Sequence, residues 1–197
     1  MTQRDDLLRG AKQCLTEKGY SHTTARDIAA ASGSHLASIG YHFGSKDKLM
    51  RAAVLEASGE WGDAIEAAAR SAGGEAPPQR LAALIGGLMA AIPEARPVHL
   101  ASLQALAEAA FDEELRLALA AGFHEGRRAL AAITLDRPTD EVDPAAERGI
   151  GSVMYALAVG YIAQFLIDPE SLPNAEEVIA ALRTLETTPP APASTEE

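Results

Sequence analysis

The chain has 197 residues, and 47% of them are hydrophobic, which is ample for a buried core in one domain or two small ones. The net charge of −11 argues at first against a nucleic-acid partner, and the single cysteine excludes an internal disulfide and fits a reducing cytosol. Aromatic residues are scarce at 5% and alanine is abundant, so helices are favoured over strands. The charged N-terminal run MTQRDDLL is unlike an export signal, and we expect an all-α, cytoplasmic protein.

The charge is unevenly distributed along the chain. Residues 1–51 contain eight lysines or arginines and five acids, a net charge of +3, whereas residues 52–197 contain nine and 23, a net charge of −14. An acidic body would be repelled by phosphate and would turn the positive end toward DNA. A merely solvated acidic surface would give the same asymmetry, so the charge alone does not decide between these interpretations.

Residues 3–19 predict the first helix. Leu7, Leu8, Ala11 and Leu15 recur at helical spacing, and Gly19 follows as a C-cap. We expect this helix to pack across the next two and to close a three-helix unit.

Residues 24–48 predict two short helices and the start of a third. Thr24 and Asp27 have the spacing of a capping box, with Asp in place of Glu. Gly33 permits a tight turn after the first helix, and Ser45 is placed to cap the third. Two short helices joined by a glycine-containing turn are typical of a helix-turn-helix.

The spacing of one set of residues in this region is more specific: Thr24, Ile28-Ala29, Gly33, Ser38-Ile39, Tyr41-His42-Phe43, Ser45-Lys46 and Leu49. In these residues the chain resembles the DNA-binding motif of TetR-family transcriptional regulators. Two positions differ from the family pattern. Ser34 and His35 stand where a hydrophobic residue and then Ser commonly follow the turn glycine, and Gly40 replaces the usual aromatic residue before Tyr41.

The resemblance implies that the second helix of the motif enters the major groove of duplex DNA. Phosphates would be held by Thr24, Tyr41, His42 and Lys46, and the base edges would be met by His35, Leu36, Ala37 and Ser38. Ser34 is a further DNA-binding candidate. Leu36 and Ala37 can touch only thymine methyl groups and Ser38 discriminates weakly, so DNA shape should supply part of the specificity. Core packing is the alternative role for Tyr41 and Phe43, and it suits Phe43 better.

The pattern of the remaining residues predicts six more helices, so that nine helices are expected in all. It contains no convincing strand. The six helices cover residues 45–72, 79–92, 98–110, 112–135, 145–167 and 174–186, with a break at residues 73–78 and a turn bracketed by Pro93 and Pro97. We expect three regions: a helix-turn-helix DNA-binding domain over residues 1–51, a helical effector-binding and dimerisation domain over 52–186, and a disordered tail over 187–197.

Residues 150–167 carry no charge over 18 positions, which is near the lower limit for a membrane span. We reject that interpretation, because the run contains two glycines, a serine and a glutamine and has no basic flank. A helix that is apolar all round can instead be buried on two sides. We expect one side to pack on the body and the other to meet a second subunit, with interface residues Ser152, Ala156, Gly160, Gln164, Val178 and Leu182.

By resemblance, the helices between residues 52 and 143 would enclose an effector cavity. Candidate lining residues are Trp61, Met89, Leu103, Phe111, Phe123, Arg127 and Tyr155, and a filled core is the competing explanation for each. His99, near the start of its helix, is interpreted as a capping or surface residue, and a ligand contact is the less favoured alternative.

The sequence contains no glycine-rich phosphate loop, no CxxC, no HExxH and no histidine–carboxylate set at metal-ligand spacing. We therefore expect no enzyme activity, no cofactor and no metal. The leading hypothesis is a dimeric, ligand-responsive regulator, usually a repressor, that binds a near-palindromic DNA operator and is released by a small-molecule effector. The alternatives are a helical interaction module that has lost DNA binding and a small-molecule enzyme that uses the cavity.

Overall fold

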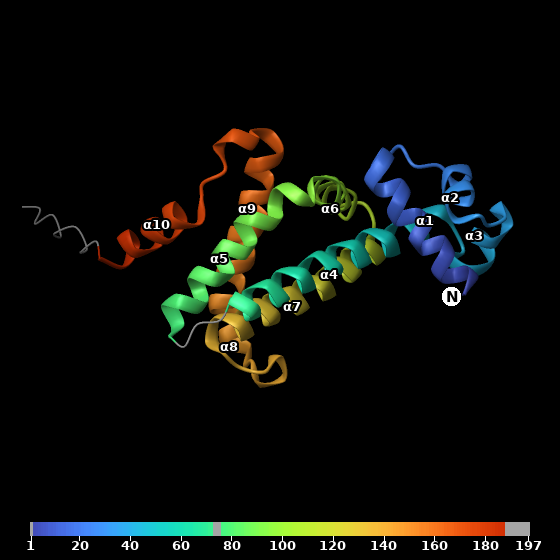
Figure 1. Cartoon of the computed structure of the whole chain (residues 1–197). Helices are drawn as coiled ribbons and strands as arrows, with labels where there is room; N and C mark the ends of the chain where they lie inside the picture. Colours follow the sequence, from blue (N-terminus) through green and yellow to red (C-terminus); the bar gives the residue numbers. More distant parts are fainter. Residues whose placement is uncertain (1, 73–75, 188–197) are drawn as a thin grey trace, which may run out of the picture.

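The computed structural model describes residues 2–72 and 76–187, and within these ranges every regular element is helical (Figure 1). The all-α prediction is confirmed, and so is the number of helices within these ranges if α8, a π-helical turn at Glu147–Gly151 and α9 are counted as one. Residues 73–75 of the break predicted at 73–78, and residues 188–197 of the tail predicted at 187–197, lie outside the described residues. The helices are α1 (Gln3–Lys18), α2 (Ala25–Ser32), α3 (Leu36–Phe43), α4 (Lys46–Ala72), α5 (Pro77–Glu94), α6 (Arg96–Glu108), α7 (Glu113–Leu135), α8 (Pro144–Ala146), α9 (Ser152–Ile167) and α10 (Ala175–Thr187).

Residues 2–51, which we call the head, form the three-helix unit and the first turns of α4. Thr24 and Asp27 make the predicted capping box, with the Asp27 amide donating to Thr24 Oγ1 at 3.2 Å. Gly33 ends α2 in the left-handed conformation with φ of 63°, which a residue with a Cβ adopts at a cost. The Lys48 amide donates to Ser45 Oγ at 3.1 Å, so Ser45 caps α4 as predicted.

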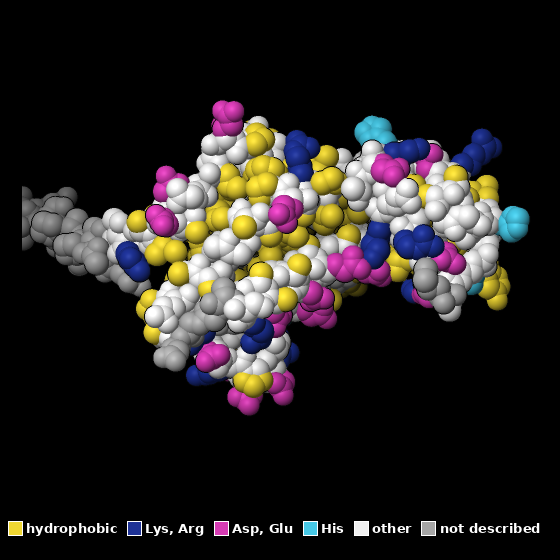
Figure 2. Space-filling model, viewed as in Figure 1, with side chains coloured by type: hydrophobic (Ala, Val, Ile, Leu, Met, Phe, Trp, Pro, Cys, Tyr) yellow, Lys and Arg dark blue, Asp and Glu magenta, His cyan; other side chains and the backbone are white. Residues whose placement is uncertain are grey.

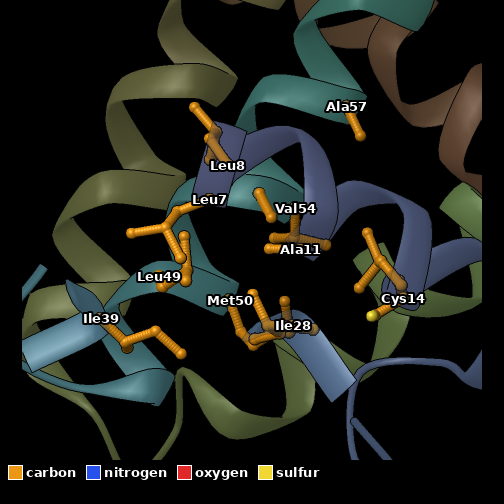
Figure 3. Close-up of a cluster of buried hydrophobic side chains, with 14 of the residues drawn as sticks. Leu7, Leu8, Ala11, Cys14, Ile28, Ile39, Leu49, Met50, Val54 and Ala57 are labelled. Carbon is orange, nitrogen blue, oxygen red and sulfur yellow. The ribbon is translucent and has the colours of Figure 1, made fainter. Parts of the chain in front are cut away.

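The core of the head is formed mainly by apolar side chains of α1 to α4 (Figure 3). It includes Leu7 and Ala11 of α1, Ile28 of α2, Ile39 of α3 and Leu49 of α4, all buried. Each of the two short helices contributes one fully buried large side chain. Tertiary packing on α1 and α4 therefore stabilises α2 and α3, since isolated helices of eight residues are not stable in water.

Gly10 sets the closest approach between α1 and α2. A Cβ at this position would lie 2.8 Å from both the backbone nitrogen and the Cβ of Ser32. We expect Gly10→Ala to lower the free energy of unfolding by about 1–3 kcal/mol, because the backbone of α2 cannot yield as a side chain can. Gly59→Ala is the control, since its Cβ would meet nothing within 4 Å, and it should stabilise the chain by about 0.5–1 kcal/mol through helix propensity. Chemical denaturation of both variants checks the opposite signs.

Residues 52–187, which we call the body, enclose a second core. It is built from Ile65 of α4, Leu84 and Ile92 of α5, Ile133 of α7 and Met154 of α9, together with further apolar side chains of these helices and α10. The long helix α4 contributes to both cores and so connects the head to the body (Figure 1).

Helix α6 contacts both the head and the body. Its Ala101 and Ala105 are fully buried in the core of the head, where Leu115 of α7 joins them. Its opposite side lines a cavity in the body.

One local prediction for the body was wrong and a second was confirmed. The fifth helix begins at Pro77 rather than at residue 79, because proline is favoured in the first turn of a helix. The turn expected between Pro93 and Pro97 is present at Ala95, with Pro93 inside the end of α5 and Pro97 in the first turn of α6. The two helices form an angle of 91° at this turn.

The helix that contains residues 144–167 is interrupted by the π-helical turn. A Cβ on Gly151 would lie 2.4 Å from the Arg127 carbonyl oxygen, so glycine is required for α9 to approach α7 this closely. By length and hydropathy alone this helix could cross a membrane, yet Met154, Ile162 and Phe165 pack in the body core. Only 28% of its most apolar window is buried, which leaves a large apolar surface to be covered.

Candidate functional site

Helix α3 lies at the end of the molecule opposite α10 and presents most of its surface to solvent (Figure 1). Ile39 is its buried anchor. Leu36, Ala37, Gly40 and Tyr41 are exposed, and Tyr41 is 87% exposed. A short helix held from one side with a large exposed aromatic side chain is suited to contact another surface.

The residues just before α3 form the turn between α2 and α3. The Ser34 amide donates to the Ala29 carbonyl at 3.0 Å, so Ser34 belongs to the end of α2 and is half-buried. His35 is the N-cap of α3 and is exposed, without a side-chain capping bond. Ser38 is half-buried one turn further on.

Tyr41 and Phe43 take different sides of α3. The Tyr41 ring lies edge-on to the imidazole of His42, with ring centroids 4.9 Å apart. Most of the Tyr41 side chain is exposed to solvent. Phe43 packs against the core of the head, with the guanidinium of Arg4 5.0 Å from its ring centroid. His42 Nε2 lies 3.1 Å from Gln3 Oε1, which holds the imidazole beside the N-terminus of α1.

The two remaining candidate phosphate contacts lie at helix starts. Thr24 Oγ1 donates to Asp27 Oδ2 at 2.6 Å, so its proton is engaged within the capping box. Hydrogen bonds from Lys18 and then Thr24 hold the pKa of Asp27 well below its usual range. Lys46 Nζ lies 3.0 Å from Asp47 Oδ1 and 3.5 Å from the Thr23 carbonyl. An exposed ion pair of this kind contributes little to stability and can be exchanged for a phosphate.

Figure 2 shows basic and histidine side chains around the head and a broad apolar area on the body. The sequence that forms the head has a net positive charge, and the sequence that forms the body has a net negative charge. This arrangement orients α3 toward a polyanion.

The comparisons with known proteins agree with this geometry. The profile described as bacterial regulatory proteins, tetR family, matches residues 7–53, which cover α1 to the first turns of α4. Residues 7–53 therefore match the DNA-binding domain of the TetR family. The chain is 38% identical over 56 residues to the HTH-type transcriptional repressor AcnR of Corynebacterium efficiens, a match that spans 28% of this chain and 30% of that relative. The AcnR of Corynebacterium glutamicum matches in the same way, at 38% over 53 residues.

Solved structures extend the likeness of the fold to the body. A protein of Rhodococcus sp. RHA1, provisionally assigned as a transcriptional regulator, superposes with a TM-score of 0.74 at 19% identity and covers 96% of this chain and 97% of its own. The multidrug binding protein EbrR, complexed with imidazole, superposes with a TM-score of 0.68 at 23% identity. The match covers 100% of this chain and 99% of EbrR. At these identities the likeness concerns the fold alone, and it confirms the predicted TetR-like architecture.

The body contains a cavity of about 500 Å³ between α4, α5, α6, α7 and α9. Four of the seven candidate effector-binding residues line it: Trp61, Leu103, Phe123 and Tyr155. The rings of Phe123 and Tyr155 lie 4.9 Å apart. Burial raises the pKa of Tyr155 to about 12, so its hydroxyl stays protonated.

The other three candidates lie elsewhere. Phe111 is 91% exposed, because α6 ends at Glu108 and places it in the turn before α7, so its assignment to the cavity was wrong. Met89 is buried in the body core. Arg127 is outside the cavity lining and donates from Nη2 to Glu147 Oε1 at 3.3 Å.

For His99 the sequence favoured a capping or surface role over a ligand contact, and the expected surface position was wrong. Helix α6 begins at Arg96, so His99 falls one turn inside it and is only 2% exposed. The imidazole lines the cavity and stands edge-on to Trp61 with ring centroids 4.6 Å apart. Burial lowers its pKa to about 4, against a backbone hydrogen bond with Ile92 that acts in the opposite direction. The ring is therefore neutral near pH 7.

The pKa of His99 predicts a dependence of stability on pH. Between about pH 6.5 and pH 4 the unfolded state binds a proton at His99 that the folded state does not, so acidification through this window favours unfolding. We expect wild type to lose up to about 3 kcal/mol more than His99→Phe across the window, since one pKa unit corresponds to about 1.4 kcal/mol. Urea denaturation of both proteins at a series of pH values measures the difference, and parallel curves would contradict the assignment.

The predicted dimer residues divide between surface and core. Ala156 and Gln164 are exposed on α9, and they share one stripe with Val153 and Ile167, which are also exposed. Ser152, Gly160 and Leu182 are half-buried. Val178 is 2% exposed in the body core, so its place in the predicted interface was wrong: α10 turns this side chain inward.

The described residues contain no group of three or more His, Cys, Asp or Glu side chains able to hold a metal ion.

Proposed function

We propose that this TetR-family transcriptional regulator binds a near-palindromic DNA operator as a homodimer and leaves it when a small-molecule effector fills the body cavity. The observation that carries the proposal is the exposed face of α3 on a head of net positive charge. In this account residues 1–51 are the DNA-binding domain and residues 52–186 bind the effector and the second subunit. We expect such a regulator in the cytoplasm, where its operator is.

The exposed side of α3 suits the major groove of B-DNA, which admits an α-helix. His35, Leu36, Ala37 and Ser38 would meet base edges, with Ser34 at the start of the helix. Tyr41, His42 and Lys46 would hold phosphates at its end. At Thr24 the hydroxyl is engaged by Asp27, so a phosphate there would be met by the free amides of the first turn of α2.

Dimerisation would use the exposed stripe of α9. Its small and apolar side chains, Val153, Ala156 and Gly160 among them, allow two copies of the helix to approach closely across a two-fold axis. Pairing would cover the apolar surface that the fold of one chain leaves open. It would also place two copies of α3 on one duplex, which a single motif needs for tight binding.

Coupling between effector and DNA would run through α6. One side of this helix packs in the core of the head at Ala101 and Ala105, and the other lines the cavity at His99 and Leu103. A second connection lies beside it, where Arg51 of the head pairs with Asp112, the N-cap of α7, and Arg51 Nη1 lies 3.3 Å from Glu114 Oε2. An effector that favours another position of α6 or α7 would shift the population toward a spacing of the heads that does not fit the operator.

Two relatives support the sign of regulation and the presence of an effector. AcnR is a repressor, and EbrR is a multidrug binding protein. We therefore favour repression relieved by a ligand.

A gel-shift assay tests the proposal with the intact chain and duplex DNA that flanks its own gene. We expect a complex that resists unrelated competitor DNA and weakens steeply as salt rises, because phosphate contacts release counterions. If the chain binds competitor and flanking DNA equally at every salt concentration, the operator-binding proposal fails. The alternative, an interaction module without DNA binding, would then be favoured.

A further inference from the structure

The polar groups that line the body cavity are mainly acceptors and negative charges. Three carboxylates line it, Asp63 and Glu66 of α4 and Glu125 of α7, and no lysine or arginine among the described residues does. Glu66 is already paired with Arg70 at 2.8 Å. The remaining lining is apolar and includes the rings of Trp61, Phe123 and Tyr155.

His99 lines this cavity and has an acceptor atom without a partner. Its Nε2 is buried and has no hydrogen-bond partner. The ring forms a backbone hydrogen bond with Ile92, and a neutral imidazole that donates there has a lone pair at the other nitrogen. A buried acceptor without a donor is costly, so a ligand that donates to Nε2 would remove that cost.

A serine pair adds further lone pairs. The hydroxyls of Ser58 and Ser102 both line the cavity and lie 2.9 Å apart. Each is also 2.8 Å from the carbonyl oxygen four residues earlier, that of Val54 or Val98. Two hydroxyl protons serve three contacts, so neither serine has a spare proton for a ligand.

Donors in the lining are few. The Trp61 indole N–H is directed to the Ala91 carbonyl at 3.5 Å. The Tyr155 hydroxyl, protonated near pH 7, remains as a donor. A carboxylate or phosphate in this cavity would meet the negative charges of Asp63 and Glu125 and the carboxylate that Glu66 shares with Arg70, and no cation of the lining.

We propose that the cavity binds an amphipathic amine: an apolar body against the aromatic rings, and a protonated nitrogen that donates hydrogen bonds and is attracted by Asp63, Glu66 and Glu125. The role of this amine as the effector rests on the proposed function, in which the effector fills the same cavity. Three independent contributions favour an amine. Donation to His99 selects N–H or O–H groups, the carboxylates select positive charge, and aromatic faces attract a cation.

Trp61 is the only tryptophan of the chain and lines the cavity, so its fluorescence reports binding without DNA. The intact protein is titrated with four compounds that share one apolar body: 4-phenylbutylamine, 4-phenylbutan-1-ol, butylbenzene and 4-phenylbutanoate. We expect the amine to bind at least about tenfold more tightly than the acid, with the alcohol between them. Binding of the acid as tight as that of the amine, or no change of fluorescence with any of the four, would overturn the proposal.

Two variants separate the contributions. His99→Phe keeps an aromatic ring but removes the acceptor, so it should abolish the advantage of the alcohol over butylbenzene while butylbenzene binds as before. Asp63→Asn combined with Glu125→Gln changes two exposed side chains and should reduce the preference for amine over alcohol severalfold. If both variants leave the order of the four affinities and the ratios between them unchanged, the proposed ligand class is wrong.

The same titrations are repeated on the protein–operator complex. Amine binding to the free protein without release of DNA would contradict the effector mechanism and leave the ligand class intact. Release of DNA by the acid and not by the amine would contradict the ligand class and leave the mechanism intact.

Discussion

Replacing both Tyr41 and Lys46 by alanine should weaken operator binding by at least about 100-fold while the chain stays folded. Both side chains contribute to the exposed end of α3 and the start of α4, and neither is part of the buried core. A dimer loses four phosphate contacts, and the loss should be similar on specific and unrelated DNA. Fluorescence anisotropy with labelled duplexes at two salt concentrations measures it, and the salt dependence should become shallower.

The chain offers matched controls for both substitutions. Phe111 is as exposed as Tyr41 but lies on the body, and Arg70 is a surface cation at the far end of α4. Phe111→Ala with Arg70→Ala should leave DNA binding within about twofold of wild type, because body residues make no phosphate contact. Ser38→Ala should mainly change sequence preference, since we propose that Ser38 meets base edges. Equal losses for the head and body pairs would contradict the assignment of α3.

Placing a charge on the exposed stripe of α9 should separate the dimer. Ala156 is exposed in the single chain, so Ala156→Glu leaves the fold intact but buries an unpaired carboxylate if two copies of α9 meet. Such a burial costs several kcal/mol, and we expect the dimer dissociation constant to rise at least about 100-fold. Affinity for a two-half-site operator should fall by about 10²–10⁴, because the second head no longer binds from within the same molecule.

Sedimentation and anisotropy on the same samples test this prediction. Ala67→Glu is the control, since Ala67 is an exposed alanine of α4 outside the stripe. A dimer of unchanged strength in Ala156→Glu would show that another surface pairs the chains. A monomer that binds the full operator as wild type does would contradict the need for two heads.

The head could be predicted from sequence because its signals are local. The capping box of Thr24, the left-handed Gly33 and the cap at Ser45 are each determined by residues within a few positions. The acidic body and the positive head also follow from counting charges. These features are enough to define the motif without knowledge of the packing.

The cavity was less predictable, because which side of a helix faces it depends on distant packing. His99 became buried since α6 begins at Arg96 after a 91° bend, and no local pattern determines that angle. Arg127 lies outside the cavity lining and is held by Glu147 in the π-helical turn, which depends on the contact of Gly151 with the backbone of α7. Val178 was misplaced because the side of α10 that packs inward was not evident from its apolar stripe alone.

The account depends on α3 of a paired chain reading duplex DNA. Selection of bound sequences from a random duplex library with the intact protein, followed by sequencing, tests this step without knowledge of the operator. The account predicts a near-palindrome whose half-sites are centred about 34–36 Å apart, or a multiple of that spacing. Enrichment of no motif, or of one isolated half-site bound by a single chain, would contradict it.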